Sequence, residues 1–121
     1  MNLIEIKNEN EIKNLAEDTK TPNRIVVIYF TGKWCGPCRL FYPELVKYVS
    51  KIPANMASKV VFTVVDCGVH EKFSKANNIN VVPTILFLQN KTILKTIIGP
   101  TIEKLDMELG KYTKISHSNN N

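Results

Sequence analysis

The chain has 121 residues and a formal net charge of +5, with 44% hydrophobic and 22% charged residues. These values are typical of one globular domain and exclude collagen-like, disordered and disulfide-scaffold classes. No apolar run approaches the length of about 18 residues that a membrane span needs, and the first residues do not resemble a signal peptide. We therefore expect one domain over residues 1–112 that does not enter a membrane, followed by a flexible tail over 113–121.

The positive charge is concentrated in the middle of the sequence. Residues 20–60 contain seven basic side chains and one acidic side chain. Such a segment is most simply a solvated, lysine-rich surface, and it also suits acidic protein partners. Its basic residues do not alternate with aromatic residues as in a groove that binds single-stranded nucleic acid. We therefore expect no nucleic-acid partner.

The first predicted elements are a short strand over residues 3–6, a helix and a buried strand. Asn8 and Glu11 have the spacing of a capping box and predict the start of the helix. Its inward-facing residues are expected to be Ile12, Leu15 and Ala16. Arg24–Phe30 is a continuous β-branched and aromatic run, which is typical of a strand covered on both faces.

A second helix follows, with Pro43 expected to kink it. Lys59–Asp66 predicts another buried strand, and residues 69–77 predict a short helix. The apolar residues that recur at helical spacing in the second helix are Cys38, Tyr42, Leu45, Val49 and Ile52.

The last part of the chain predicts a hairpin and a final helix. Val81–Leu88 forms one strand, residues 89–92 a turn and Ile93–Ile98 the other strand. Thr101 can cap the helix, whose inward side chains are Ile102, Leu105, Leu109 and Tyr112. Together the elements predict the α/β class, with one mixed sheet and helices on both faces.

Two cysteines lie at the junction between the buried strand and the second helix. Cys35 and Cys38 are separated by two residues, so both sulfurs reach the first helical turn. A helix N-terminus stabilises a thiolate, and the cationic side chains of Lys33 and Arg39 add electrostatic support. The outer Cys35 is therefore the expected nucleophile, and Cys38, which begins the inward stripe, is the expected resolving thiol.

The motif Trp34-Cys35-Gly36-Pro37-Cys38 resembles the active-site motif of the thioredoxin family. Further similarities are the helix proline Pro43, the segment Val82-Pro83-Thr84 and Gly99, so the resemblance covers about residues 25–110. It implies the thioredoxin fold, with a central mixed sheet of about five strands flanked by about four helices.

The resemblance also implies roles and an activity. Gly36 and Pro37 would tune the redox pair. The substrate-binding residues would be Trp34, Val82, Pro83 with a cis peptide bond, and Thr84. The chain would be a cytoplasmic, monomeric protein-disulfide reductase, or an organellar one if a leader had been removed. It would need no bound cofactor beyond the Cys35–Cys38 disulfide. Electrons would come from an NADPH-dependent thioredoxin reductase and pass to disulfide-containing proteins or peroxidases.

The sequence departs from the family pattern in three ways. Tyr29 replaces a buried aspartate that serves proton transfer, and Val64 replaces its frequent lysine partner. A phenol is a poor base at neutral pH, so we expect a slower or water-dependent release step. Thr31-Gly32 replaces an aromatic residue and makes the nearby surface smaller, and Asn90-Lys91 replaces a hairpin Asn-Gly pair.

Two other functions compete with the reductase. One is a binding module that docks a partner beside Pro83, with redox turnover secondary. The other is an oxidase or isomerase of an oxidising compartment.

The third cysteine, Cys67, is expected near the same end of the sheet as Cys35, as a buried thiol without a role or as a regulatory thiol. With His70 it completes a Cys₃His pattern that resembles a zinc ribbon, but a dithiol at a helix start argues against this metal site. His117 is expected to be a tail residue without a role.

Overall fold

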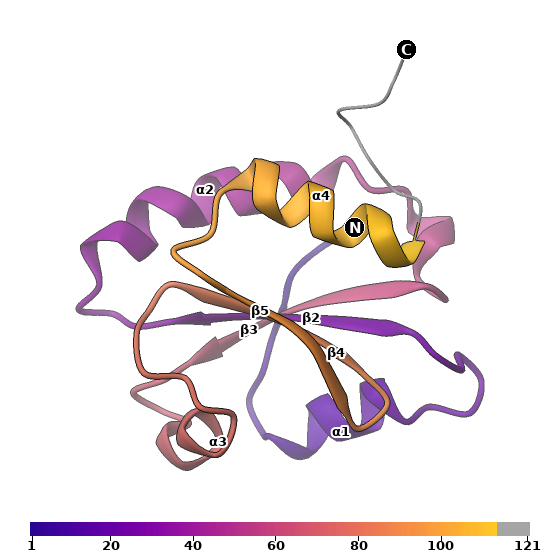
Figure 1. Ribbon diagram of the computed structural model, residues 1–121, viewed down its shortest axis with the longest axis horizontal. Coiled ribbons are helices and arrows are strands. Elements are labelled where there is room, and N and C mark those ends of the chain that lie inside the picture. The colour runs from indigo at the N-terminus through magenta and orange to yellow at the C-terminus, as the bar shows by residue number, and fades with distance from the viewer. Residues whose placement is uncertain (114–121) are drawn as a thin grey trace.

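A five-stranded mixed sheet forms the centre of the computed structural model, which describes residues 1–113 (Figure 1). The strand order is β1-β3-β2-β4-β5; β1, β3 and β2 are parallel, and β4 and β5 are antiparallel to their neighbours. This arrangement confirms the mixed sheet predicted from the sequence. The strands are β1 (Ile4–Glu5), β2 (Ile25–Thr31), β3 (Val60–Asp66), β4 (Thr84–Gln89) and β5 (Thr92–Ile98).

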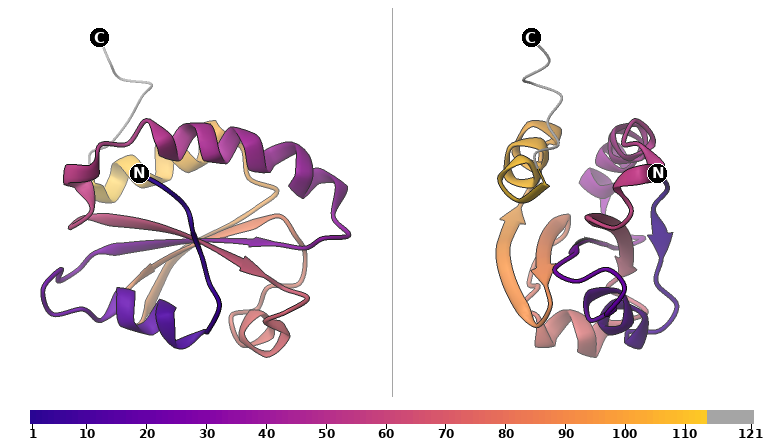
Figure 2. Two further views of the ribbon diagram at one scale, coloured as in Figure 1. Left: turned by 180° about the vertical axis from the view of Figure 1, so that it is seen from behind. Right: turned by 90° about the vertical axis from the view of Figure 1, so that its right-hand side faces the viewer.

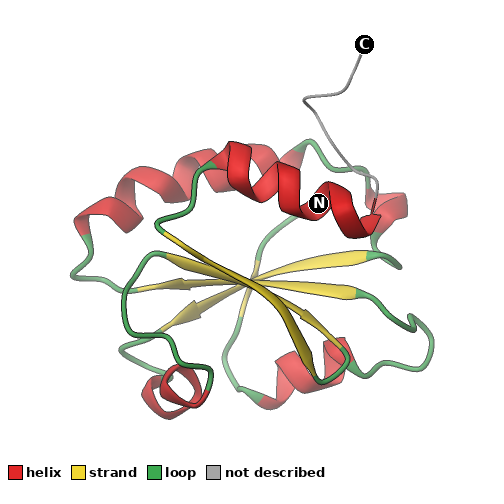
Figure 3. Cartoon of the chain, viewed as in Figure 1, coloured by secondary structure: helices red, strands yellow, loops and turns green. Residues whose placement is uncertain are grey.

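Helices cover both faces of the sheet. In Figures 1 and 3, α2 and α4 lie above the sheet and α1 and α3 lie below it, and the side view in Figure 2 shows the same layers. Within residues 1–113, no helix is both long enough and apolar enough to cross a membrane. The helices are α1 (Asn10–Ala16), α2 (Gly36–Ser50), α3 (Glu71–Ala76) and α4 (Ile102–Thr113), with a 3₁₀ turn at Ala54–Met56.

Strand β2 supplies both hydrophobic cores. Its side chains alternate, so that Ile25, Val27 and Tyr29 pack with α2 and α4. The residues between them, Val26 and Ile28, pack with α1 on the other face. Burial on both faces explains why the sequence of β2 is a continuous apolar run rather than an alternating one. It also fixes the position of the residues that follow β2.

The first helix starts slightly later than its capping-box pattern predicts. Glu11 Oε1 accepts a hydrogen bond from the Asn8 amide at 3.0 Å, as a capping box requires. Asn8 Oδ1, however, accepts a hydrogen bond from the Asn10 amide at 2.8 Å. This bond closes a local turn and takes the place of the second capping-box bond, which would come from the Glu11 amide. The helix therefore begins at Asn10.

The inward face of α2 differs from the predicted one at one position. Phe41 is buried, whereas Tyr42 is 42% exposed. Tyr42 lies at the edge of the apolar face, where its ring stacks on that of Tyr29 with centroids 6.2 Å apart. Pro43 lies inside α2, which continues to Ser50.

The last helix begins as predicted and extends to the end of the described chain. Thr101 Oγ1 accepts a hydrogen bond from the Lys104 amide at 3.1 Å and so caps α4. Leu105 and Leu109 are buried, while Tyr112 is 36% exposed. Thr113, where we expected the tail to begin, is still helical, and residues 114–121, including His117, lie outside the described residues.

A buried hydrogen bond joins α2 to α4 and gives a test of the fold. The hydroxyl of Tyr48 donates to Asp106 Oδ1 at 2.8 Å. We expect Tyr48→Phe to lower the free energy of unfolding by about 1–2 kcal/mol, because the hydrogen bond is lost while the ring is kept. Urea unfolding measures this change. Tyr42→Phe is the matched control and should change stability by less than about 0.5 kcal/mol, and equal effects of the two substitutions would contradict the expectation.

Candidate redox site

The cysteine pair lies where β2 turns into α2. Cys35 is the N-cap of α2, and its Sγ accepts a hydrogen bond from the Cys38 amide at 3.1 Å. The two cysteines form a disulfide with their Cα atoms 5.2 Å apart. Pro37 lies in the first helical turn, where its missing N–H costs no helical hydrogen bond. After reduction, unpaired amides and the positive end of the helix dipole would stabilise a Cys35 thiolate.

Both sulfur-bearing residues are largely covered. Cys35 is 6% exposed and Cys38 is 2% exposed. The order agrees with the sequence-based expectation that Cys35 is the outer residue and Cys38 the inner one. A substrate sulfur therefore reaches Cys35 more easily than Cys38.

The segment before β4 lies beside Cys35. The Val82–Pro83 peptide bond is cis, and the Val82 carbonyl oxygen lies 3.6 Å from Cys35 Sγ. The hydroxyl of Thr84 donates a hydrogen bond to the Val81 carbonyl oxygen at 2.7 Å, which stabilises the turn around Pro83. Gly99, with φ of +59°, donates its amide to the Pro83 carbonyl at 3.2 Å. Four sequence-predicted residues are thus placed at one site with Cys35.

A cleft of about 720 Å³ opens beside Cys35, and we call it the Cys35 cleft. Trp34 lines it and is 66% exposed. A Cβ atom on Gly32 would lie 2.7 Å from the Trp34 ring, and one on Gly68 would lie 3.0 Å from it. These two glycines therefore let the indole approach the backbone closely. The sequence reasoning missed their role, because it depends on contacts between separate loops. Other lining residues are Gly36, Pro37, Cys67, Glu71, Ser74, Lys75, Val81 and Val82.

A second cleft, of about 750 Å³, reaches Cys38, and we call it the Cys38 cleft. Lys33 and Arg39, predicted to support the redox pair electrostatically, line this second cleft and are exposed. They lie on the side of Cys38 and not on the side of Cys35. Asp66 and His70 also line the Cys38 cleft, and the sequence reasoning assigned neither of them to the redox pair.

Tyr29 occupies the position where the family pattern has a buried acid. It is 1% exposed, and its hydroxyl donates to the Cys38 carbonyl oxygen at 3.2 Å. Burial raises the pKa of the Tyr29 phenol, although the Thr31 hydroxyl partly opposes this shift. Tyr29 therefore holds the backbone of α2 and stays protonated at neutral pH. Val64 is the residue paired with Tyr29 in the register of β2 and β3, as expected from the family pattern.

Cys67 lies in the Cys35 cleft, at the predicted end of the sheet. Its Sγ accepts a hydrogen bond from the Ser74 hydroxyl at 3.2 Å. Burial raises the pKa of the Cys67 thiol, and the Ser74 hydrogen bond offsets only part of that shift. A raised pKa lowers the thiolate fraction, so the structure gives no support to Cys67 as a reactive regulatory thiol.

The zinc-ribbon alternative is not supported by the positions of its four residues. In the described part of the chain, no three His, Cys, Asp or Glu side chains come together as a possible metal site. His70 Nε2 lies 3.0 Å from the Ile6 carbonyl oxygen, and Cys35 and Cys38 are bonded to each other.

Known proteins are similar to this chain in sequence and in fold. The thioredoxin family model matches residues 5–111. The chain belongs to the thioredoxin family. It is 31% identical over 112 residues to thioredoxin H8 of Arabidopsis thaliana, which covers 93% of this chain and 72% of that protein. The thioredoxin of Schistosoma mansoni superposes with a TM-score of 0.77 at 28% identity, covering 92% of this chain and 95% of that one. The thioredoxin of Malassezia sympodialis also gives a TM-score of 0.77, at 27% identity, covering 92% of this chain and 90% of that one.

Family membership and the disulfide at the helix start identify the activity class. This thioredoxin is a thiol–disulfide oxidoreductase, with Cys35 and Cys38 as its redox-active pair. The thioredoxin fold predicted from the sequence is confirmed.

Replacing Tyr29 with the acid typical of the family tests proton transfer at Cys38. We expect Tyr29→Asp to add an ionisation near neutral pH to the rate of the release step, because burial raises the pKa of a carboxyl group. The pH–rate profile of that step is the measurement. Tyr29→Phe is the control, since it adds no titratable group. An unchanged profile for Tyr29→Asp would show that position 29 has no influence on the proton.

The reactivity of Cys67 is the second test at this site. We expect mild peroxide to oxidise the Cys35–Cys38 pair while leaving Cys67 unmodified, because the raised pKa keeps Cys67 protonated. Mass spectrometry of peptides measures both events. Ser74→Ala, which removes the hydrogen bond that lowers the pKa, should leave Cys67 equally unreactive, and oxidation of Cys67 at the rate of the pair would contradict the expectation.

Proposed function

We propose that this thioredoxin is a protein-disulfide reductase. The observation that carries the proposal is the position of the redox pair, with Cys35 in an open cleft between Trp34 and Val82. An extended substrate segment could lie against this cleft beside the cis Pro83 and present its disulfide to Cys35 Sγ.

The reduction proceeds in two exchanges. The Cys35 thiolate attacks one sulfur of the substrate disulfide and expels the other as a thiolate, which takes a proton from solvent. The Cys38 thiol then loses its proton and attacks Cys35 Sγ, and the second substrate sulfur leaves. The substrate gains two electrons and two protons, and the Cys35–Cys38 disulfide is formed.

The proposed partners follow from this chemistry. A thioredoxin reductase that uses NADPH would return the disulfide to the dithiol, and proteins with disulfides, including peroxidases, would accept the electrons. The pair itself is the redox group, so we propose no bound cofactor. We further propose a monomer acting in the cytoplasm. The exposed Lys33 and Arg39 near the pair favour partners with acidic surfaces.

The reduction potential of the Cys35–Cys38 pair tests the direction of the reaction. Equilibration against dithiothreitol or glutathione, followed by alkylation and mass measurement, gives the value. We expect about −270 mV, as for reducing thioredoxins. A value of about −120 to −180 mV would instead indicate an oxidant or isomerase.

Serine variants separate the reductase from a binding module. We expect Cys35→Ser to abolish the reduction of a protein disulfide, and Cys38→Ser to trap the disulfide between Cys35 and the substrate. Cys67→Ser is the matched control and should keep full activity. Full biological activity of Cys35→Ser would favour a module that docks partners beside Pro83.

A further inference from the structure

The Cys38 cleft gives the resolving cysteine its own opening. It is separate from the Cys35 cleft in its lining, which contains Cys38 but not Cys35. Thr31 and Gly32 line the Cys38 cleft at the end of β2, where the family pattern often has an aromatic residue. Small side chains at these two positions leave room for solvent beside Cys38.

The interior beside Cys38 offers no group that can take its proton. The nearest phenol, Tyr29, donates its hydrogen to the Cys38 carbonyl oxygen and has a raised pKa. Among residues 1–113, the buried carboxylates are Asp106 and Glu108, and both lie on α4. Asp106 accepts from Tyr48, about three helical turns beyond Cys38 on α2. The proton must therefore leave through the cleft.

Several charged or titratable groups face the Cys38 cleft. A general base works best when its ordinary pKa is close to the working pH, which favours imidazole over carboxylate, phenol, amine or guanidinium groups. Among residues 1–113, His70 is the one histidine that lines this cleft. The other groups are Glu5 and Lys7 from the β1 segment, Lys33 from the loop after β2, Arg39 and Tyr42 from α2, and Asp66 from β3.

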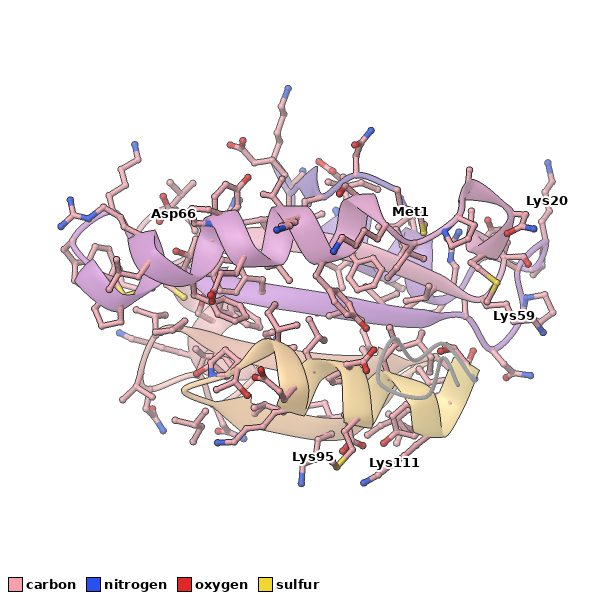
Figure 4. All side chains as sticks on the ribbon, turned by 90° about the horizontal axis from the view of Figure 1, so that it is seen from above. Met1, Lys20, Lys59, Asp66, Lys95 and Lys111 are labelled. Carbon is pink, nitrogen blue, oxygen red and sulfur yellow. A yellow bond between two sulfur atoms is a disulfide. The ribbon has the colours of Figure 1, made fainter. Side chains whose placement is uncertain are left out.

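The structure also determines which nitrogen of His70 is free. Nε2 lies 3.0 Å from the Ile6 carbonyl oxygen, and a carbonyl oxygen can only accept, so Nε2 carries the hydrogen. In the neutral ring Nδ1 is then the nitrogen that can accept a proton. The backbone holds this residue in place, because the His70 amide donates to the Asp66 carbonyl at 2.8 Å. Figure 4 shows Asp66 at the same end of the molecule as the N-terminal end of α2.

We propose that His70 accepts the proton of the Cys38 thiol through water in the Cys38 cleft. The inference rests on the reductase function proposed above and concerns its second exchange. The proton passes from Cys38 Sγ by way of water to His70 Nδ1, the Cys38 thiolate attacks Cys35 Sγ, and the substrate sulfur leaves with the electron pair of the broken bond. His70 then returns its proton to solvent. The side chain thereby replaces the buried acid that Tyr29 displaces.

An aromatic disulfide that releases a coloured thiolate separates the two exchanges in a stopped-flow experiment. Reduced protein with Cys67→Ser, which removes the third thiol, releases one thiolate when Cys35 attacks and a second when Cys38 resolves. We expect His70→Gln to slow the second phase by about a hundredfold at pH 7 and to flatten its dependence on pH. The first phase should keep its rate, because Cys35 faces the other cleft. Glutamine keeps an N–H donor for the Ile6 carbonyl oxygen.

Control variants assign the effect to His70. His117→Gln replaces the other histidine of the chain and should change neither phase. Thr31→Phe, which fills the cleft and keeps His70, should also slow the second phase. A His70→Gln protein whose second phase keeps both its rate and its pH dependence would overturn the proposal.

Two further outcomes are distinguishable. If Asp66→Asn flattens the pH dependence and His70→Gln does not, the proton acceptor is the carboxylate and the assignment to His70 is wrong. Loss of the first phase in the parent Cys67→Ser protein would instead remove the reductase function, since Cys35 would then fail to attack a disulfide.

Discussion

The burial of β2 on both faces is the constraint on which the redox site depends. Since neither face of this strand can move without opening a core, the end of β2 is a fixed point in the structure. Four residues later the chain has turned into α2, and Cys35 is its N-cap. The helix N-terminus that stabilises a thiolate is thus held by the packing of the whole domain. The cis segment at Pro83, which leads into the neighbouring strand β4, is fixed by the same sheet.

Most of the fold was predictable from patterns within short segments of the sequence, such as apolar runs and helix caps. The apolar run of β2 predicted a central strand, and Thr101 predicted the start of α4. Side-chain direction within a helix was less predictable: Tyr42 and Phe41 are adjacent and both aromatic, and only packing against the sheet determines which one is buried. The capping box at Asn8 is half formed because the Asn8 side chain accepts from the Asn10 amide, a local alternative to capping the helix.

The residues of the candidate site that belong to one sequence motif were predictable. Those contributed by separate loops were not. The spacing of Cys35 and Cys38 alone also allowed a zinc site, and the full motif Trp34–Cys38 together with the segment at Pro83 identified the redox pair. His70 carried no local signal that connected it to Cys38, because residues from β1, α2 and the turn after β3 jointly form the cleft that both line. The disulfide lies between two clefts. One cleft is lined by Cys35 and the other by Cys38.

The placement of Trp34 has a consequence for how this protein is observed. It is the single tryptophan of the chain, it is 66% exposed in the folded state, and it lines the same cleft as Cys35. Oxidation of the neighbouring dithiol places a disulfide, an efficient quencher, beside it. Tryptophan fluorescence is therefore a built-in, label-free indicator of the oxidation state of this protein.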